Sequence, residues 1–327
     1  MPRKPAASFH VPILVTGGLG FIGGHLVEEL IALGATNIRV FDNGLRAVTS
    51  TAAWPREVVE VIGGDIRDLT ALQHALQDCE VVFHLAAQSN VMGAVHDPEC
   101  SCATNVGGTL NVLIAARDQA VRRLVFTSSR EVYGDVDCLP VQESAALLPK
   151  NLYGASKVAG EMYCRAFASE TLEISVLRLA NVYGPRDQNR VIPIFLKQAI
   201  EGEPITVYGG AQILDFVWID TVVNALLKAG FGEVIPYPLN VGSGVGTTVQ
   251  ELAQRVLELI PSDSKCIYLP TRSLEVTKFV ADLSLAKNYL GLSNSEDPLG
   301  HLSELIHKNQ SQVALSEMYK DDRCNWQ

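Results

Sequence analysis

The sequence predicts an α/β fold, in which a doubly wound parallel sheet is joined to a smaller, mixed α/β C-terminal domain. In the first half of the chain, short apolar runs alternate with segments of helical periodicity. A glycine-rich turn connects the first apolar run to the first helical segment, and the alternation loosens after about residue 180. Apolar strands separated by helices are typical of a parallel sheet covered on both faces, and right-handed crossovers make such a sheet doubly wound.

The individual elements follow from two periodicities. Runs of Val, Ile, Leu and Phe bounded by Gly, Asp or Ser indicate buried strands, whereas apolar residues three and four apart indicate helices. The expected strands span residues 11–16, 37–41, 58–63, 81–85, 124–128 and 174–179. The expected helices span residues 25–33, 69–75, 107–116, 153–169, 249–259 and 283–290.

Composition limits the class of protein. The chain has 327 residues, of which 47% are hydrophobic, and this fraction excludes wholesale disorder. The net charge of -10 argues against a nucleic-acid partner, which requires a basic surface. The seven cysteines fit neither a disulfide framework nor a zinc site, so we expect reduced thiols, no metal and a cytoplasmic protein.

The N-terminal region also predicts no membrane partner. Residues 5–27 contain no Asp, Glu, Lys or Arg, but five glycines interrupt the segment. A membrane-spanning helix needs about 20 consecutive apolar residues, so this stretch fits a strand, a turn and the start of a helix instead. The basic residues before it lead into no signal-peptide core.

The glycine-rich turn is the first functional signal. The sequence TGGLGFIG at 16–23 has the spacing G-x-x-G-x-x-G, with Gly17, Gly20 and Gly23 in the key positions. The first glycine permits the tight turn, the second lets a pyrophosphate approach the backbone, and the third lets helix and strand pack closely. Together with Phe21 and Ile22, these residues form a predicted dinucleotide-binding turn at a helix N-terminus.

Two acidic residues follow later strands. Asp42 ends the second expected strand, 25 residues after Gly17. A carboxylate there accepts a hydrogen bond from the adenosine ribose 2′-hydroxyl and repels a 2′-phosphate, which favours NAD over NADP, although Arg46 lies near enough to weaken that preference. Asp65 follows the third strand, where it could contact the adenine or only cap a turn.

A second motif carries the chemistry. Tyr153 and Lys157 are four residues apart at the start of an expected helix, so both side chains lie on one face. An ammonium and an oxidised nicotinamide beside a phenol favour the phenolate and lower the pKa of the tyrosine toward the working range. Ser129, at the end of a strand 24 residues upstream, can hydrogen-bond the same substrate oxygen.

Together, these residues resemble the extended short-chain dehydrogenase/reductase family, in particular its nucleotide-sugar epimerases and dehydratases with a Rossmann domain. The resemblance runs from about residue 12 to about residue 292. Besides the glycine-rich turn, the shared segments are FHLAAQ at 83–88, NVGGT at 105–109, TSSREVYG at 127–134, YGASK at 153–157, RLANVYGP at 178–185, VIPIF at 191–195, DFVWID at 215–220, and Arg272 with Ala281 and Asp282.

The resemblance implies an NAD-dependent 4-epimerase, with a UDP-hexose as the expected substrate. NAD would be reduced and regenerated within one turnover through a transient 4-keto sugar. Tyr153 would take the proton of the 4-hydroxyl, Ser129 would hydrogen-bond O4, and Lys157 would hold the nicotinamide ribose. Residues 1–178 would form the NAD-binding domain, with 214–242 returning to it, and residues 179–327 would bind the nucleotide sugar.

Further contacts are implied by the same resemblance. The remaining expected cofactor-binding residues are Asn43, Asp65, Ile66, Leu85, Ala86, Ala87, Gln88 and Asn105. The remaining expected substrate-binding residues are Gln88, Asn181, Arg186, Val191, Arg272 and Glu275. Without the resemblance, Asn181 would be interpreted as a turn cap and Arg272 as a surface charge.

Three positions depart from the family pattern. Leu214 replaces an Arg that precedes the Asp-Phe pair, so one diphosphate contact is lost and the grip rests on Arg272 or Arg186, or is weaker. Ala94 replaces a Ser common in 4-epimerases, which leaves the hexose open. Glu131 stands where dehydratases and decarboxylases carry a base, but Arg130 replaces the Asp that some dehydratases use as an acid. Glu131 therefore either takes part in chemistry or pairs with Arg130 or Arg186.

Other readings of the sequence stay open. Within the family, the alternatives are a nucleotide-sugar dehydratase, a decarboxylase or a 4-keto-sugar reductase. Outside it, the alternative is a non-catalytic NAD-binding scaffold. A homodimer is expected from the family, and apolar positions in two helices fit either the dimer face or the core: Leu110, Val112, Leu113, Met162 and Phe167.

Overall fold

A seven-stranded sheet forms the centre of the molecule in the computed structural model, which describes residues 9–307. Every strand pairing in this sheet is parallel. The strand order is β10 (Leu239–Val241), β6 (Glu173–Leu179), β5 (Arg123–Ser129), β4 (Val81–His84), β1 (Ile13–Thr16), β2 (Ile38–Asp42) and β3 (Val59–Gly63). The order reverses between β1 and β4, and ligands of doubly wound sheets bind beyond the strand ends at such a point.

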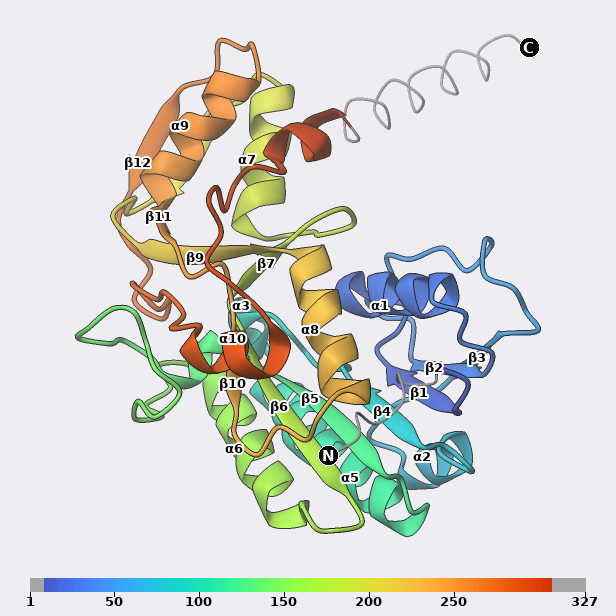
Figure 1. The fold of residues 1–327 in the computed structure, drawn as a ribbon. Helices are drawn as coiled ribbons and strands as arrows, with labels where there is room; N and C mark the ends of the chain where they lie inside the picture. The colour runs from blue at the N-terminus through green and yellow to red at the C-terminus, as the bar shows by residue number, and fades with distance from the viewer. Residues whose placement is uncertain (1–8, 308–327) are drawn as a thin grey trace, which may run out of the picture.

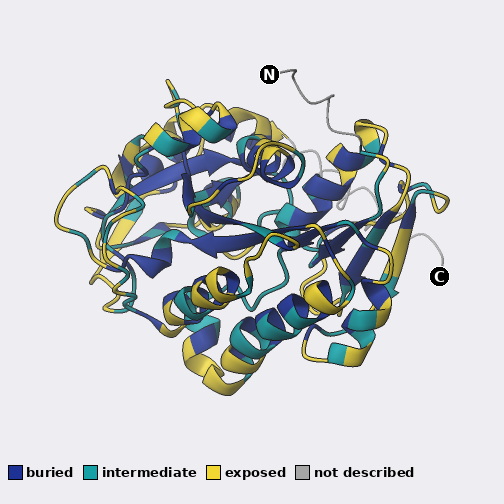
Figure 2. Ribbon diagram, turned by 60° about the horizontal axis from the view of Figure 1, so that its bottom comes forward, coloured by how far each residue is buried: buried dark blue, intermediate teal, exposed yellow. Residues whose placement is uncertain are grey.

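Helices cover both faces of this sheet (Figure 1). On one face α1 (Phe21–Ala32) packs against α8 (Ile219–Phe231), and on the other α5 (Thr109–Asp118) lies between α2 (Leu69–Ala75) and α6 (Leu152–Phe167). Alternate residues of β1, β4 and β5 enter two separate apolar clusters, so these central strands are buried on both faces and strands in the middle of Figure 2 are dark blue, whereas the edge strand β3 is partly exposed.

The smaller part of the molecule contains two short sheets. One sheet has the order β11 (Gly246–Thr248), β9 (Ile213–Trp218) and β7 (Asn181–Tyr183). The other pairs β12 (Cys266–Leu269) with β8 (Ile205–Tyr208). Helices α7 (Val191–Ile200) and α9 (Val249–Leu259) pack on each other beside these strands, while α10 (Ser284–Leu290) contacts α8 and β10 (Figure 1).

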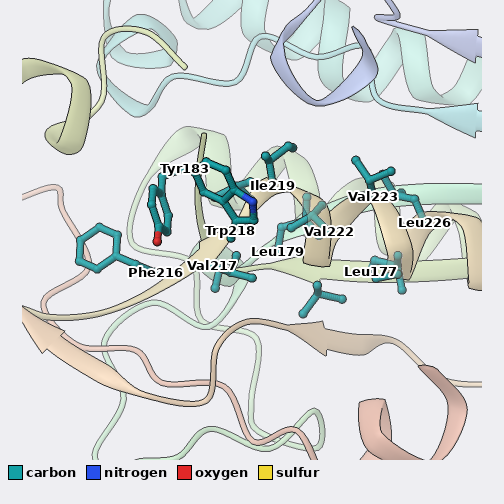
Figure 3. Packing of buried hydrophobic residues seen from close by; sticks show 14 of the residues in the cluster. Leu177, Leu179, Tyr183, Phe216, Val217, Trp218, Ile219, Val222, Val223 and Leu226 are labelled. Carbon is teal, nitrogen blue, oxygen red and sulfur yellow. The ribbon is translucent and has the colours of Figure 1, made fainter. Parts of the chain in front are cut away.

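One helix and one carboxylate join the two parts. Figure 3 shows Ile219, Val222 and Val223 of α8 continuing the apolar cluster that Trp218 and Tyr183 begin in the small sheet. Asp215 of β9 is fully buried and accepts four hydrogen bonds, from the N–H and hydroxyl of Ser243 and from the N–H groups of Gly244 and Ala281. These bonds fix the loop after β10 and the segment before α10 to the small sheet.

A buried ion pair fixes α6 to the central sheet. Arg178 of β6 donates from Nε and Nη2 to the two carboxylate oxygens of Glu161, at 2.9 and 2.7 Å. Ser128 of β5 donates to the same carboxylate. Nη1 of Arg178 donates to the hydroxyl of Tyr133, which in turn donates to Asn240 of β10. Bidentate pairs of this kind are among the strongest side-chain hydrogen bonds.

The central elements lie where the sequence predicts them, with small shifts at their ends. The expected helix at 107–116 is longer, because the chain runs through α4 (Pro98–Cys102) and a π-helix (Ala103–Gly108) directly into α5. Segment 214–242 divides: β9 lies in the small sheet, whereas α8 and β10 pack on or pair with the large one. Val112 and Leu113 are fully buried core residues, so they do not form a dimer face; only Met162 of that set is exposed.

Two further findings bear on the sequence expectations. The helices described in residues 9–307 include none that is both long enough and apolar enough to cross a bilayer. The cysteines at 79, 100, 102, 138, 164 and 266 are free, and Cys324 lies outside the described residues. Two short helical segments follow the central strands: the helix α3 (Val91–His96) after β4 and a 3-10 turn (Arg130–Val132) after β5.

His84 is a neutral structural histidine at the end of β4. Thr109 donates its hydroxyl proton to the Asn105 carbonyl, so it accepts from Nε2 of His84 at 3.0 Å. Thr16 accepts from the Ala86 N–H and lies 2.8 Å from Nδ1, to which it donates. This network assigns the Nε2–H tautomer, and burial lowers the pKa of His84 to about 3.

We expect His84 to make stability sensitive to acid. The unfolded chain binds a proton near pH 6.5 but the folded chain only near pH 3, so the stability present above pH 6.5 falls as the pH falls. Between pH 6.5 and 4.5 this group should account for about 2 kcal/mol of lost unfolding free energy. Urea denaturation at each pH in this range gives the unfolding free energy of the wild type and of His84→Gln. If this free energy falls equally with pH in both proteins, the assignment is wrong.

Candidate active site

A cavity of about 1100 Å³ opens at the carboxyl ends of the central strands. Its wall combines the turns that follow β1, β2, β4 and β5 with residues of α6, α7 and the small sheets. Gly17 and Asp42 line one end, Ser129 and Tyr153 line the middle, and Arg272 lines the other. The topology of the sheet thus gathers the predicted dinucleotide turn and the predicted Tyr/Lys pair in one space.

The backbone at the first end fits a dinucleotide. Gly17 has φ +72°, and a Cβ there would meet the Ala86 nitrogen at 2.8 Å. A Cβ on Gly23 would meet the Gly17 carbonyl at 2.2 Å, so the chain can close this turn only with glycine. Helix α1 begins at Phe21 with no side-chain cap and no acidic residue in its first turn. Its free N–H groups therefore suit a pyrophosphate.

The two acids beyond this turn have different partners. Asp42 accepts from the Leu19 and Gly44 N–H groups, one on each oxygen, and keeps lone pairs for ribose hydroxyls. Asp65 accepts three bonds from Arg67 and one from Asn43, and these bonds hold the pKa of its carboxyl well below the usual range. Asp65 lines the cavity but acts as a cap for its own turn.

Tyr153, Lys157 and Ser129 meet in the middle of the cavity. Asn151 caps α6 by accepting from the Gly154 N–H at 2.8 Å, and this fixes the first turn of the helix that carries Tyr153. A Cβ on Gly154 would meet the Glu131 carbonyl at 2.4 Å, so the glycine after Tyr153 lets the helix approach the end of β5. The side chain of Ser129 is one of the groups that lower the pKa of the Tyr153 phenol.

The ionisation of Tyr153 depends on its burial and on the charges around it. Burial raises its pKa to about 12, and the strongest opposing influence is the guanidinium of Arg190. Lys157 lies 5.8 Å from the Tyr153 ring and donates to the Thr127 carbonyl at 2.8 Å, and burial lowers the pKa of Lys157 to about 8. Arg190 is thus a positive charge that favours the phenolate, and the sequence analysis did not single it out.

Arg190, which the sequence analysis did not single out, belongs to the same loop as Arg186. It lies 3.5 Å from Asp187 and 5.7 Å above the ring of Phe21. Both Arg186 and Asn189 have positive φ, a conformation that is uncommon for residues other than glycine. Burial raises the pKa of Asp187 to about 6. The only signal in the sequence was the position of this loop directly before the VIPIF segment.

Glu131 pairs with Arg130, one of the two partners that the sequence left open. The distance from Arg130 Nη2 to Glu131 Oε1 is 2.9 Å, and Asn151 donates to the other oxygen at 2.7 Å. Arg186, the other candidate, instead forms a bidentate pair with Glu28 of α1, at 2.6 and 2.7 Å. Nη1 of Arg130 is buried and has no hydrogen-bond partner among residues 9–307.

The far end of the cavity is shaped by an aromatic and an arginine. The guanidinium of Arg272 lies 3.7 Å above the ring of Tyr208 and donates to Glu275 at 3.2 Å. Asn181 is fixed by its bond to the Asp215 carbonyl. Leu214 lines the wall between them without adding a charge. Tyr208 was not singled out from the sequence, where a tyrosine before two glycines resembles any strand end.

The structure brings nearly all the site residues predicted from the sequence into the lining of this one cavity. The cavity is lined by Gly17, Gly20, Phe21, Ile22, Gly23, Asp42, Asn43, Asp65, Ile66, Leu85, Ala86, Ala87, Gln88, Ser129, Glu131, Tyr153, Lys157, Asn181, Arg186, Val191, Arg272 and Glu275. Asn105 lies behind it, where it bonds the backbone of Gln88 and the hydroxyl of Ser156. Within residues 9–307, no group of three His, Cys, Asp or Glu side chains is arranged to bind a metal.

Comparison with known proteins extends this description. A model of the NAD-dependent epimerase/dehydratase family matches residues 13–236. The chain is 35% identical over 288 residues to a UDP-glucose 4-epimerase of Mycolicibacterium smegmatis, covering 85% of this chain and 92% of that protein. It is 32% identical over 272 residues to a UDP-N-acetyl-α-D-glucosaminuronate decarboxylase of Bacillus cytotoxicus, covering 79% and 83%. The structure of a Thermotoga maritima UDP-glucose 4-epimerase with UDP-glucose superimposes with a TM-score of 0.86 at 33% identity, covering 93% of this chain and 100% of that one.

Asp42 and Asp65 give a matched test of cofactor choice. We expect Asp42→Ala to weaken NAD binding by about tenfold, because a charge-assisted hydrogen bond to ribose is lost. The ratio of the NADP to the NAD dissociation constant should also fall. Asp65→Ala is the control, since its carboxylate is already committed to Arg67. Isothermal titration of both variants with both dinucleotides measures the ratio, and an equal loss of preference in both would refute the distinction.

Proposed function

Because the chain belongs to the NAD-dependent epimerase/dehydratase family and is an enzyme of that type, we propose that it interconverts the C4 epimers of a UDP-hexose. The observation that carries the proposal is the single cavity that Ser129, Tyr153 and Lys157 share with the glycine turn and Asp42. A hydroxyl-bearing carbon held at Tyr153 would lie between a dinucleotide at one end and a nucleotide held by Arg272 at the other.

NAD, when bound, supplies the acceptor for a hydride and returns the same hydride. The chain's own residues would handle the proton. Tyr153 would take it from the sugar 4-hydroxyl while Ser129 hydrogen-bonds the same oxygen, and Arg190 would favour the phenolate that results. Lys157, whose ammonium is already directed at the Thr127 carbonyl, would hold the nicotinamide ribose. Asp42 would hold the adenosine ribose.

Binding of the rest of the substrate is proposed for the small sheets and α7. Tyr208 offers a ring for the nucleobase, Arg272 a positive charge for a phosphate, and Glu275 an acceptor for a ribose hydroxyl. Asn181 and Val191 line the wall between this end and Tyr153. We also propose that residues 1–178 and 214–242 serve mainly the cofactor and residues 179–327 the nucleotide sugar.

A decarboxylase or dehydratase of the same family is the second candidate. It is favoured by one observation, a carboxylate at Glu131 in the wall beside Tyr153, and by the similarity to a decarboxylase. A base next to a 4-keto sugar can remove an acidified proton, after which a neighbouring group is lost. Product mass separates these reactions from epimerisation, which conserves it.

We propose a homodimer that uses the exposed apolar residues of α6. Met162 is 46% exposed, and Leu152 and Tyr163 are also exposed on this helix. Since Val112 and Leu113 are core residues, α5 can contribute only its remaining outer surface. The cytoplasmic location expected from the sequence stays a prediction.

The reaction is tested with purified protein and a panel of UDP-, dTDP- and GDP-sugars, without added reductant. Mass spectrometry and proton NMR should find a product of unchanged mass with an inverted C4. Loss of carbon dioxide or water would instead establish the second candidate, and no turnover of any sugar would overturn both.

Tyr153→Phe should lower turnover by about 100-fold or more, because the proton acceptor is removed while ring packing is kept. Tyr163→Phe is the matched control, since this tyrosine lies on the same helix but outside the cavity lining. Turnover is measured at saturating sugar with equal NAD content in each sample. Full activity in Tyr153→Phe would assign the proton transfer to another group.

A further inference from the structure

Glu131, an acid in the lining of the proposed active site, has a partner on each of its two carboxylate oxygens. Glu131 lines the cavity with Ser129 and Tyr153, yet its side chain is only 8% exposed. Arg130 engages one carboxylate oxygen at 2.9 Å, and Asn151 engages the other at 2.7 Å. To act as a base, Glu131 would have to accept a proton on the carboxylate that balances the charge of the nearly buried Arg130 and that Asn151 holds in place.

The bond from Asn151 is fixed by the helix that it caps. Its amide oxygen accepts from the Gly154 N–H, so its amino group must face acceptors. The acceptors present are Glu131 and the Leu274 carbonyl, at 2.7 and 3.2 Å. One oxygen of Glu131 is therefore held by the architecture of the α6 N-terminus.

The bond from Arg130 is held from behind. Its Nε donates to the amide oxygen of Asn181 at 3.2 Å, and Asn181 is anchored by donating to the Asp215 carbonyl at 3.1 Å. The Arg130 side chain is 11% exposed, so few water molecules can replace Glu131 as its partner. Freeing this oxygen of Glu131 would leave a nearly buried guanidinium without its anion, which is strongly unfavourable.

We propose that Arg130 is a positioning residue that keeps Glu131 out of proton transfer and so confines the reaction to C4. The inference rests on the proposed function, because a 4-keto sugar is what acidifies the hydrogen at C5. With an oxygen of Glu131 free, the C5–H bond would break, its electron pair would move onto the C4 oxygen as an enolate, and the proton would pass to Glu131. The proton on the Glu131 carboxyl would exchange with solvent, and protonation of the enolate by Glu131 would then place a solvent hydrogen at C5.

Exchange at C5 in heavy water measures this directly. The wild type and Arg130→Met are incubated with the epimerised UDP-hexose in D₂O, and deuterium at C5 is expressed per inverted C4, so that a slower variant is still comparable. We expect almost no C5 deuterium in the wild type and at least about a tenfold higher ratio in Arg130→Met. The double variant Arg130→Met with Glu131→Gln should return to the wild-type ratio, because the base is gone.

Two further variants exclude trivial explanations. Arg130→Lys restores a cation and should lower the ratio again, which a purely structural role would not predict. Arg117→Met removes an arginine that lies outside the cavity lining and pairs with Asp118, and its ratio should equal that of the wild type. Circular dichroism and NAD content verify folding, and Arg130→Gln, which retains a hydrogen-bonding side chain, replaces Arg130→Met if the latter does not fold.

The outcomes separate the inference from the function on which it rests. Inversion at C4 with unchanged C5 exchange in Arg130→Met overturns the inference alone, as does exchange in the wild type at the rate of inversion. A raised ratio that persists in the double variant with Glu131→Gln assigns the base elsewhere and also overturns it. Absence of C4 inversion overturns the proposed function and the inference together, and if no Arg130 variant folds, the arginine is structural and the inference fails.

Discussion

The buried pair between Glu161 and Arg178 is the constraint on which the site depends. It joins the helix that carries Tyr153 and Lys157 to β6, while Ser128 joins the same carboxylate to β5. Because Ser129 directly follows Ser128, one ion pair sets the relative position of all three groups proposed for proton transfer. A Cβ on Gly160 would meet Phe126 at 2.6 Å, so the helix packs as closely on the sheet as a glycine permits. Such a pair contributes geometry more than net stability.

A cavity rich in arginine occurs here in a chain of net charge -10. Arg46, Arg190 and Arg272 line it, and each is held by a neighbour: Ser89, Asp187 and Tyr208, respectively. The acidic residues, which outnumber the basic residues by 36 to 26, lie mostly elsewhere on the surface, where solvent screens them. Net charge alone therefore says little about the charge of the ligand that a protein binds.

The sequence predicted the fold class and the family, and both are confirmed by the sheet topology and the comparisons. The starts of helices 69–75 and 249–259 were predicted correctly, because Asp68 and the Thr248–Glu251 capping box define these starts locally. The start of α1 was missed because glycines replace a cap. Spacing identified Gly17, Asp42 and Tyr153. It could not decide whether Glu131 pairs with Arg130 or with Arg186, and it did not reveal the effect of Arg190 on the pKa of Tyr153, because both depend on how separate segments pack.

The four hydrogen bonds on Asp215 have a consequence for how ligands enter. They bind a loop of the large sheet and the segment before α10 to the strand that forms the opposite wall of the cavity. The two walls are therefore one mechanical unit, and a hinge between them would expose a carboxylate stripped of its donors. Opening the cavity at such a hinge would therefore cost these hydrogen bonds, whereas residues 186–190, with Arg186 and Asn189 in left-handed conformations, border the cavity without taking part in them.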